Sequence, residues 1–242
     1  MIRRIIKALI AVAITCYMLF ALTVIPSFSN DGSCKGVLVE LSDNSLEAIS
    51  REDIIDILEK DSIDPSGKGM DEFLCRDIEE KIGEISLIKE CQVYKSIGGY
   101  VNIEISCREP IIKIFDKNGE AYCMDSEGNI IYGIQKALHL PVASGYIEKE
   151  SAVDDLQEVA TAISRSSFWS AQIEQVYLNE KKEIILIPRV GDHIIELGTS
   201  TDADKKLKKL YIFYTQTLNI VGWNKYNKIN IEFADKIVCT KR

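Results

Sequence analysis

The sequence predicts an α+β fold with a single N-terminal transmembrane helix, a small strand-helix-helix-strand-strand domain, and a mostly antiparallel β domain with two helices. Three patterns predict it: an uncharged apolar run at residues 8–25, two helical stripes followed by alternating strands up to Cys107, and short alternating runs between turn signals after Pro110. The 242 residues, 46% of them hydrophobic, suffice for one large or two small domains.

The N-terminus predicts where the chain resides. Arg3, Arg4 and Lys7 precede the uncharged run from Ala8 to Ile25, which as a helix would be about 27 Å long, close to the hydrocarbon thickness of a bilayer. The positive-inside rule then keeps residues 1–7 in the cytoplasm and exports everything after a span at 8–26. A cleaved signal peptide is the alternative, although the run is longer than the usual apolar region of about 7–15 residues.

Charge excludes one class of partner. The chain carries a formal net charge of −8 at pH 7. Because three basic residues lie before the predicted span, the remainder is more acidic still. Binding to phosphates depends on clustered Lys and Arg, so nucleic acid and anionic lipid head groups are not expected partners.

The first exported domain is expected at residues 34–110, after a polar linker at 27–33. Its helices show apolar side chains at helical spacing, and its strands alternate apolar and polar positions. The expected elements are a strand at 34–43, a helix opening at Ser50, a linker at 61–70, a helix at 71–85, and strands at 91–95 and 100–107. Two helices over three strands with one apolar face form a self-sufficient α+β unit.

Arg108, Glu109 and Pro110 mark the junction between the two domains, because proline lacks a ladder donor and forces its predecessor toward extended geometry. The second domain is expected at 111–242. Helices are predicted at 151–166 and 203–218, among short strands. The chain is expected to end on one strand, Ile229 to Cys239, with a possible bulge at Ala234-Asp235 where the alternation lapses. A final strand has no hairpin partner downstream and can leave an open edge.

Cysteines and histidines do not indicate a metal or cofactor. Six cysteines lie in the exported part, with no C-x-x-C pair, and the two histidines, His139 and His193, are isolated. Cys91 and Cys107 fall in phase with apolar strand positions and are expected to be buried. A disulfide among the six remains open in an oxidising compartment.

Catalytic motifs are absent from the sequence. There is no G-x-S-x-G and no phosphate loop, and neither histidine has a motif that marks it as a base. The lysines at 205, 206, 208 and 209 are interrupted by Leu207 and Leu210, which predicts the solvated side of an amphipathic helix. We therefore expect no catalytic residue and no small-molecule substrate.

An ordered series of residues carries a family resemblance. Its members are Arg108-Glu109-Pro110, then Gly119, Tyr122, Asp125 and Gly128, then Leu140-Pro141 with Gly145, then Gly198 before a Lys/Leu helix, and finally Trp223 and Tyr226. In this order behind a single anchor, the chain resembles the bacterial cell-division family FtsQ/DivIB, in the form typical of Bacteroidetes. The first domain then looks like the family's POTRA domain. Cys107 and Cys123 depart from the family pattern.

The resemblance implies a function. In FtsQ proteins the C-terminal strand lies at a sheet edge and accepts a strand from FtsB, whose companion is FtsL, which is β-strand addition. The implied contact residues here are Phe233, Ala234, Asp235, Lys236, Ile237 and Val238. The chain would be a non-enzymatic inner-membrane scaffold of the division septum. The alternatives are a POTRA-bearing accessory protein of export or outer-membrane assembly, or a cleaved secreted binding protein.

Overall fold

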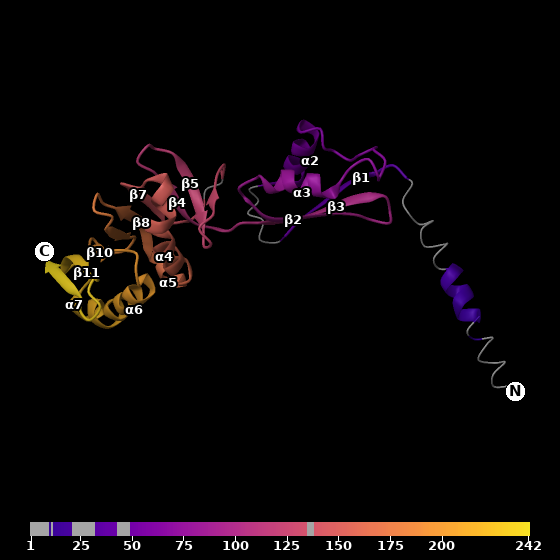
Figure 1. The fold of residues 1–242 in the computed structure, drawn as a ribbon. Helices are drawn as coiled ribbons and strands as arrows, with labels where there is room; N and C mark the ends of the chain where they lie inside the picture. The colour runs from indigo at the N-terminus through magenta and orange to yellow at the C-terminus, as the bar shows by residue number, and fades with distance from the viewer. Residues whose placement is uncertain (1–9, 11, 21–31, 43–48, 135–137) are drawn as a thin grey trace. The chain divides into compact units, whose positions relative to one another are not determined.

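The computed structural model describes residues 10, 12–20, 32–42, 49–134 and 138–242. The chain divides into two compact units, one formed by residues 1–40, 51–82 and 91–105, and the other by 41–50, 83–90 and 106–242 (Figure 1). Residues 12–20 are helical. Among the described residues no helix is both long enough and apolar enough to cross a bilayer. Ala8 and Ile25, the ends of the predicted anchor, lie outside the described residues.

The smaller sheet has three strands in the order β1-β3-β2. Its elements are β1 (Gly36–Leu41), α2 (Arg51–Lys60), α3 (Cys75–Gly83), β2 (Ile88–Lys95) and β3 (Tyr100–Cys107). Alternate residues of β3, such as Val101 and Ile103, are fully buried, as are Ile54 of α2 and Ile82 of α3. The predicted element order is confirmed. The second helix begins four residues later than predicted, and Leu74 just before it is 64% exposed.

The larger sheet has nine strands in the order β12-β11-β10-β9-β8-β7-β4-β5-β6. Five of its neighbouring pairs are antiparallel and three are parallel, so the mostly antiparallel prediction is confirmed. Its strands are β4 (Pro110–Phe115), β5 (Ala121–Asp125), β6 (Ile130–Ile131), β7 (Val142–Gly145), β8 (Ile173–Leu178), β9 (Ile184–Pro188), β10 (Ile194–Gly198), β11 (Tyr226–Asn230) and β12 (Val238–Lys241).

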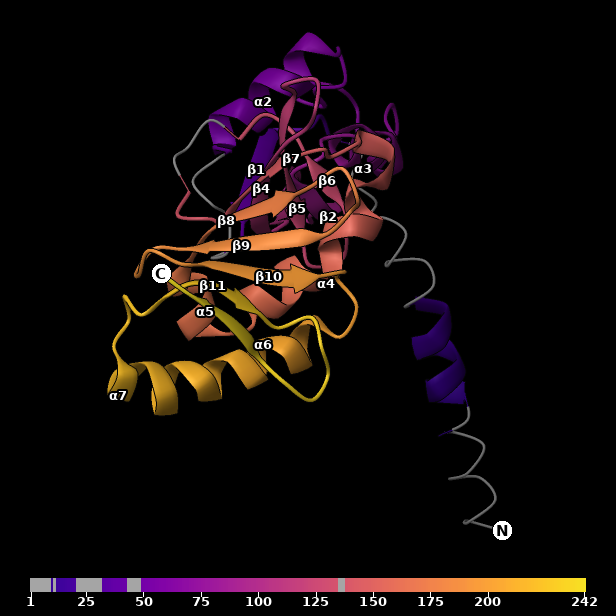
Figure 2. The same ribbon diagram turned by 90° about the vertical axis from the view of Figure 1, so that its left-hand side faces the viewer.

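Helices lie beside this sheet (Figure 2). Buried side chains from these helices and from the strands form one hydrophobic core. The helices are α4 (Ala152–Ser164), α5 (Ser167–Gln172), α6 (Ala203–Phe213), a π-helical turn at Tyr214–Leu218, and α7 (Asn219–Val221). The two long helices match the prediction. The short helix α5 was not predicted, because six residues are too few to show a helical period.

The predicted terminal strand Ile229–Cys239 is wrong. The segment is a hairpin, in which β11 and β12 pair antiparallel and residues 231–237 connect them. Two interactions end β11. The Asn230 side-chain oxygen accepts a hydrogen bond from the Glu232 N–H. The Lys209 ammonium donates to carbonyl groups of the connection, which in a continuous strand would accept hydrogen bonds from a neighbouring strand. Of the expected contact residues, only Val238 lies in a strand.

The prediction that all four lysines of α6 are solvated is correct for only two of them. Lys205 and Lys208 are exposed, as predicted for a solvated face. Lys206 is only 9% exposed and donates to the Thr199 carbonyl at 2.9 Å, and Lys209 is half-buried. One side of α6 therefore turns two of its four lysines toward backbone carbonyls of its own unit.

All seven cysteines are free. Cys107 is buried as predicted, whereas Cys91 is only half-buried. Burial raises the pKa of the Cys91 thiol to about 11, and nearby Glu79 contributes in the same direction. This thiol therefore stays protonated and weakly reactive at neutral pH.

Candidate functional site

An ion pair within the larger unit joins Arg108, which precedes β4, to Asp125 at the end of β5. Arg108 Nη1 lies 3.1 Å from Asp125 Oδ2, and the two side chains are 20% and 8% exposed. Pro110 opens β4 and is paired in register with Asp125 of β5, a position where its missing N–H costs no ladder hydrogen bond. Glu109 lies in the link between β3 and β4. Arg108 and Asp125 belong to separate motifs of the sequence, and the fold joins them.

Asp125 also builds its own turn. One carboxylate oxygen accepts the N–H groups of Glu127 and Asn129, and its carbonyl accepts the N–H of Gly128, whose φ is +88°. Burial acts to raise the pKa of Asp125, but hydrogen bonds from Asn129, Arg108 and the backbone outweigh it and hold the pKa below its usual value. The carboxylate is therefore charged at neutral pH.

The same turn is formed around Asp116 without an arginine. Asp116 accepts the N–H groups of Asn118 and Glu120, and its carbonyl accepts the N–H of Gly119 at φ +85°. The two glycines supply the positive φ that other residues resist. These motif residues therefore shape hairpins, and the pairing with Arg108 distinguishes the second turn from the first.

The candidate partner-binding edge is β12. In the sheet order β12 is terminal and has β11 as its single neighbour. The Arg242 N–H donates to the Lys225 carbonyl on the β11 side. Since successive residues of a strand direct their backbone groups to opposite sides, the backbone groups of Lys241 and Cys239 point away from β11. The described strands leave that side of β12 open.

Side chains on this edge divide between two faces. Ile237 and Cys239 pack against the core of the larger unit. Val238 is 46% exposed, and Phe233 in the preceding connection is 43% exposed. The Lys236 ammonium lies 4.7 Å from the centre of the Phe233 ring. The edge thus combines an open backbone with two accessible apolar side chains, which is what strand addition uses.

The C-terminal end of β12 is tied to the turn before β10. Arg242 pairs with the Asp192 carboxylate at 3.0 Å and donates to its carbonyl at 2.9 Å. Next in the chain, His193 is 2% exposed, and its Nε2 lies 2.6 Å from the Tyr214 hydroxyl. Burial lowers the pKa of His193, with the Arg242 charge acting in the same direction. Trp223 contacts both rings, tilted against His193 and edge-on to Tyr214. An aromatic platform therefore supports this end of the edge strand.

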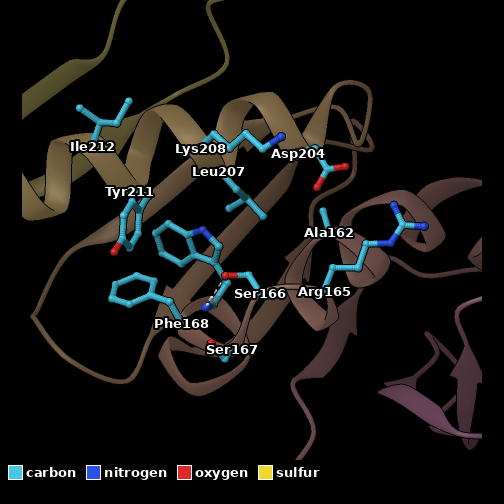
Figure 3. A pocket seen from close by; sticks show the side chains of 11 residues that line it. Ala162, Arg165, Ser166, Ser167, Phe168, Asp204, Leu207, Lys208, Tyr211 and Ile212 are labelled. Atoms are coloured by element: carbon cyan, nitrogen blue, oxygen red, sulfur yellow. Dashed lines mark hydrogen bonds between the residues drawn. The ribbon is translucent and has the colours of Figure 1, made fainter.

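A groove of about 800 Å³ lies between α4, α5 and α6 (Figure 3). Its lining residues are Ala162, Arg165, Ser166, Ser167, Phe168, Trp169, Asp204, Leu207, Lys208, Tyr211 and Ile212. The Ser166 hydroxyl accepts a hydrogen bond from the Trp169 N–H and so caps α5. The groove contains no histidine and no cysteine, so it offers no base–nucleophile pair of the usual kinds.

No metal site is formed by the residues that the structure describes, since no three His, Cys, Asp or Glu side chains gather there. His139 and His193 belong to different segments, and the second is committed to Tyr214. The arrangement that stands out is therefore an exposed backbone edge with supporting anchors, which suits binding of a polypeptide.

Comparison with known families agrees with this geometry. A family model described as FtsQ/DivIB, C-terminal related matches residues 109–240. The chain belongs to the FtsQ/DivIB family. A model described as POTRA-like domain matches residues 32–106, over the small three-stranded unit. A search of curated proteins found no match. The family resemblance read from the motifs is confirmed, and the FtsQ/DivIB family is non-enzymatic.

Sequence reasoning missed one part of this site. The contact segment was placed on a strand, whereas Phe233 to Ile237 form a connection held by Lys209. The lapse of alternation at Ala234-Asp235 was the signal for a turn, and it was interpreted as a bulge.

Proposed function

We propose that this chain is a non-enzymatic scaffold of the divisome that captures the FtsB–FtsL pair by β-strand addition to β12 at the forming septum. The observation that carries the proposal is the terminal place of β12 in the nine-stranded sheet, with the backbone of Lys241 and Cys239 directed outward. A strand from FtsB would extend the sheet by one position.

The side chains beside this edge support the same proposal. Main-chain hydrogen bonds give affinity to any extended peptide, so selectivity depends on side chains. Phe233 and Val238 are accessible and apolar, and Asp235 and Lys236 lie between them in the connection. Charged residues next to an open edge discourage pairing between copies of the same chain. A partner strand with apolar side chains facing Val238 is therefore favoured over a second copy of β12.

We also propose that residues 8–26 anchor the chain in the inner membrane, with residues 1–7 in the cytoplasm and the bulk in the periplasm. The support is the uncharged run between Ala8 and Ile25 with basic residues on one side alone. Two measurements test the anchor: mass spectrometry of the mature chain and carbonate extraction of membranes. An intact Met1 and retention in the pellet are expected, whereas loss of residues 1–26 would contradict the anchor.

A single backbone donor tests strand addition. Lys241 is exposed, and its N–H points away from β11, so Lys241→Pro removes an outward donor without breaking the pairing inside the fold. Lys241→Ala removes the same side chain and keeps the donor. We expect Lys241→Pro to weaken capture of FtsB by roughly tenfold, the value of about one well-formed hydrogen bond, and Lys241→Ala to bind like the wild type.

Two further variants complete the test. Deletion of Phe233 to Arg242 removes the whole edge and is expected to abolish capture. Phe233→Lys replaces the proposed apolar contact with a charge and is expected to have the same effect. The POTRA-like unit should stay folded in both. Unchanged capture of FtsB by the deletion variant would show that the contact lies elsewhere.

A further inference from the structure

The connection between β11 and β12 is exposed yet held by an inward-facing charge. Residues 232–236 are all exposed, and none of them belongs to a helix or strand. The side chain of Lys209, from α6, donates hydrogen bonds to the carbonyls of Ile231 at 3.1 Å and Lys236 at 3.2 Å. It also donates to the carbonyl of Phe233. An ammonium has three N–H donors, so its hydrogen-bonding capacity is fully used on this one segment.

The hydrogen bonds of Lys209 link both ends of the connection to one side chain. Its three acceptors span the connection from the end of β11 to two residues before β12. The start of the connection is fixed separately, because Asn230 accepts the Glu232 N–H at 3.0 Å and donates to Glu196 at 3.2 Å. Residues 231–237, which lie outside both strands, are thereby held in one backbone conformation.

Holding the connection in this way has an energetic cost. Burial lowers the pKa of Lys209, and the neighbouring charge of Lys206 lowers it further, while Asp235 acts in the opposite direction. The hydrophobic core of this unit does not include the exposed residues 232–236. The partly buried ammonium of Lys209 thus orders a surface segment that lies outside the core. Such ordering before a partner binds is typical of a preorganised binding surface.

We propose that Lys209 is a positioning residue of the partner-binding edge, which orders residues 231–237 so that Phe233 and β12 meet an incoming strand in one fixed arrangement. This inference rests on the proposed function of β12. The Phe233 carbonyl is held by Lys209, while its ring lies under the Lys236 ammonium, so both ends of this residue are fixed before a partner arrives. A partner then binds without the entropic cost of ordering the segment.

Two substitutions on one helix separate positioning from charge. Lys209→Met removes the three hydrogen bonds and keeps the aliphatic stem. Lys208→Met removes an equal charge one position away, where no hydrogen bond of the side chain is present among the described residues, and serves as the matched control. Three readouts are taken on the full chain: hydrogen exchange of amides 231–241, the urea midpoint from tryptophan fluorescence, and affinity for FtsB.

In the free chain, Lys209→Met should speed exchange of amides 232–240 by at least about tenfold, with a nearly unchanged urea midpoint, whereas Lys208→Met should leave both as in the wild type. Affinity for FtsB should fall about tenfold in Lys209→Met alone. If the urea midpoint of Lys209→Met collapses, Lys209→Arg replaces it. It keeps the charge, but its planar donors cannot reach all three carbonyls, so intermediate exchange and affinity are expected.

Each contrary result has a distinct meaning. Unchanged exchange in Lys209→Met overturns the inference, and so does faster exchange with unchanged affinity for FtsB. In both cases wild-type binding to FtsB would leave the proposed function standing. Failure of the wild-type chain to bind FtsB would overturn the proposed function and, with it, the role assigned to Lys209.

Discussion

The ion pair between Arg108 and Asp125 can be isolated by a substitution that leaves the turn intact. Asp125→Asn keeps a side-chain oxygen that accepts the N–H groups of Glu127 and Asn129, so the turn geometry is retained. What is lost is the negative charge 3.1 Å from Arg108, whose side chain is 20% exposed. The variant therefore leaves a mostly buried guanidinium without its main counterion.

The expected cost lies between two limits. Exposed ion pairs contribute about 0–1 kcal/mol, and breaking a fully buried pair costs about 3–5 kcal/mol. Here both groups are mostly but not fully buried, and Glu127 remains 3.8 Å from Arg108 as a second, weaker partner. We therefore expect the free energy of unfolding to fall by about 2 kcal/mol. With a urea m-value of about 2 kcal/mol/M, the midpoint would shift by about 1 M.

The assay reports on the larger unit alone, because both tryptophans of the chain, Trp169 and Trp223, lie in it. Urea unfolding is followed by their fluorescence. The control is Asp116→Asn, which alters the same kind of turn where no arginine is paired, and it should shift the midpoint by less than half as much. Equal shifts in the two variants would refute the reasoning, because the pairing with Arg108 would then contribute nothing.

Acidity gives an independent check of the same pair. The pKa of Asp125 is lower in the folded chain than its usual value of 3.8. A carboxyl group with a depressed folded pKa contributes stability that is present above the unfolded pKa and lost as the pH falls through the folded pKa. The difference in midpoint between the wild type and Asp125→Asn should thus be constant above about pH 5 and shrink below about pH 4.

Two other predictions concern the larger unit. Gly145→Ala should lower the free energy of unfolding by about 3 kcal/mol or more, because φ is +108° and a Cβ there would lie 2.2 Å from a carbonyl oxygen of β8. The control is Gly119→Ala, at φ +85° with open space around it, which should lower the free energy of unfolding by about 1 kcal/mol in the same urea assay. Tyr214→Phe should cost about 1–3 kcal/mol by leaving His193 without its hydrogen-bond partner, whereas Tyr211→Phe, at an exposed position, should be neutral. Because the folded pKa of His193 is lowered, wild-type stability should also fall as the pH drops below about 6.5, and a midpoint that rises on acidification would contradict this.

Local patterns predicted most of the fold because most elements bury one face. Alternation in β3 and the helical stripe that places Ile54 and Leu58 on one side correspond to residues that are almost fully buried. The break between β3 and β4 at Arg108 and Glu109 was predictable for another reason, since Pro110 restricts its own backbone and that of its predecessor. The partner of Arg108 was not, because Asp125 lies seventeen residues away and nothing in the intervening sequence fixes how the hairpin folds back.

Two errors of sequence interpretation share one physical cause. Lys209 was assigned to a solvated helix face and residues 231–237 to a strand, and each assignment fits its own local period. In the structure the ammonium of Lys209 donates to carbonyls of that segment, so the lysine is half-buried and these carbonyls are not free for a strand ladder. A contact over more than twenty residues outweighed local preference at both ends. Such local conflicts concentrate at functional surfaces, and this one lies beside the open edge of β12, where the proposed strand addition requires an ordered connection.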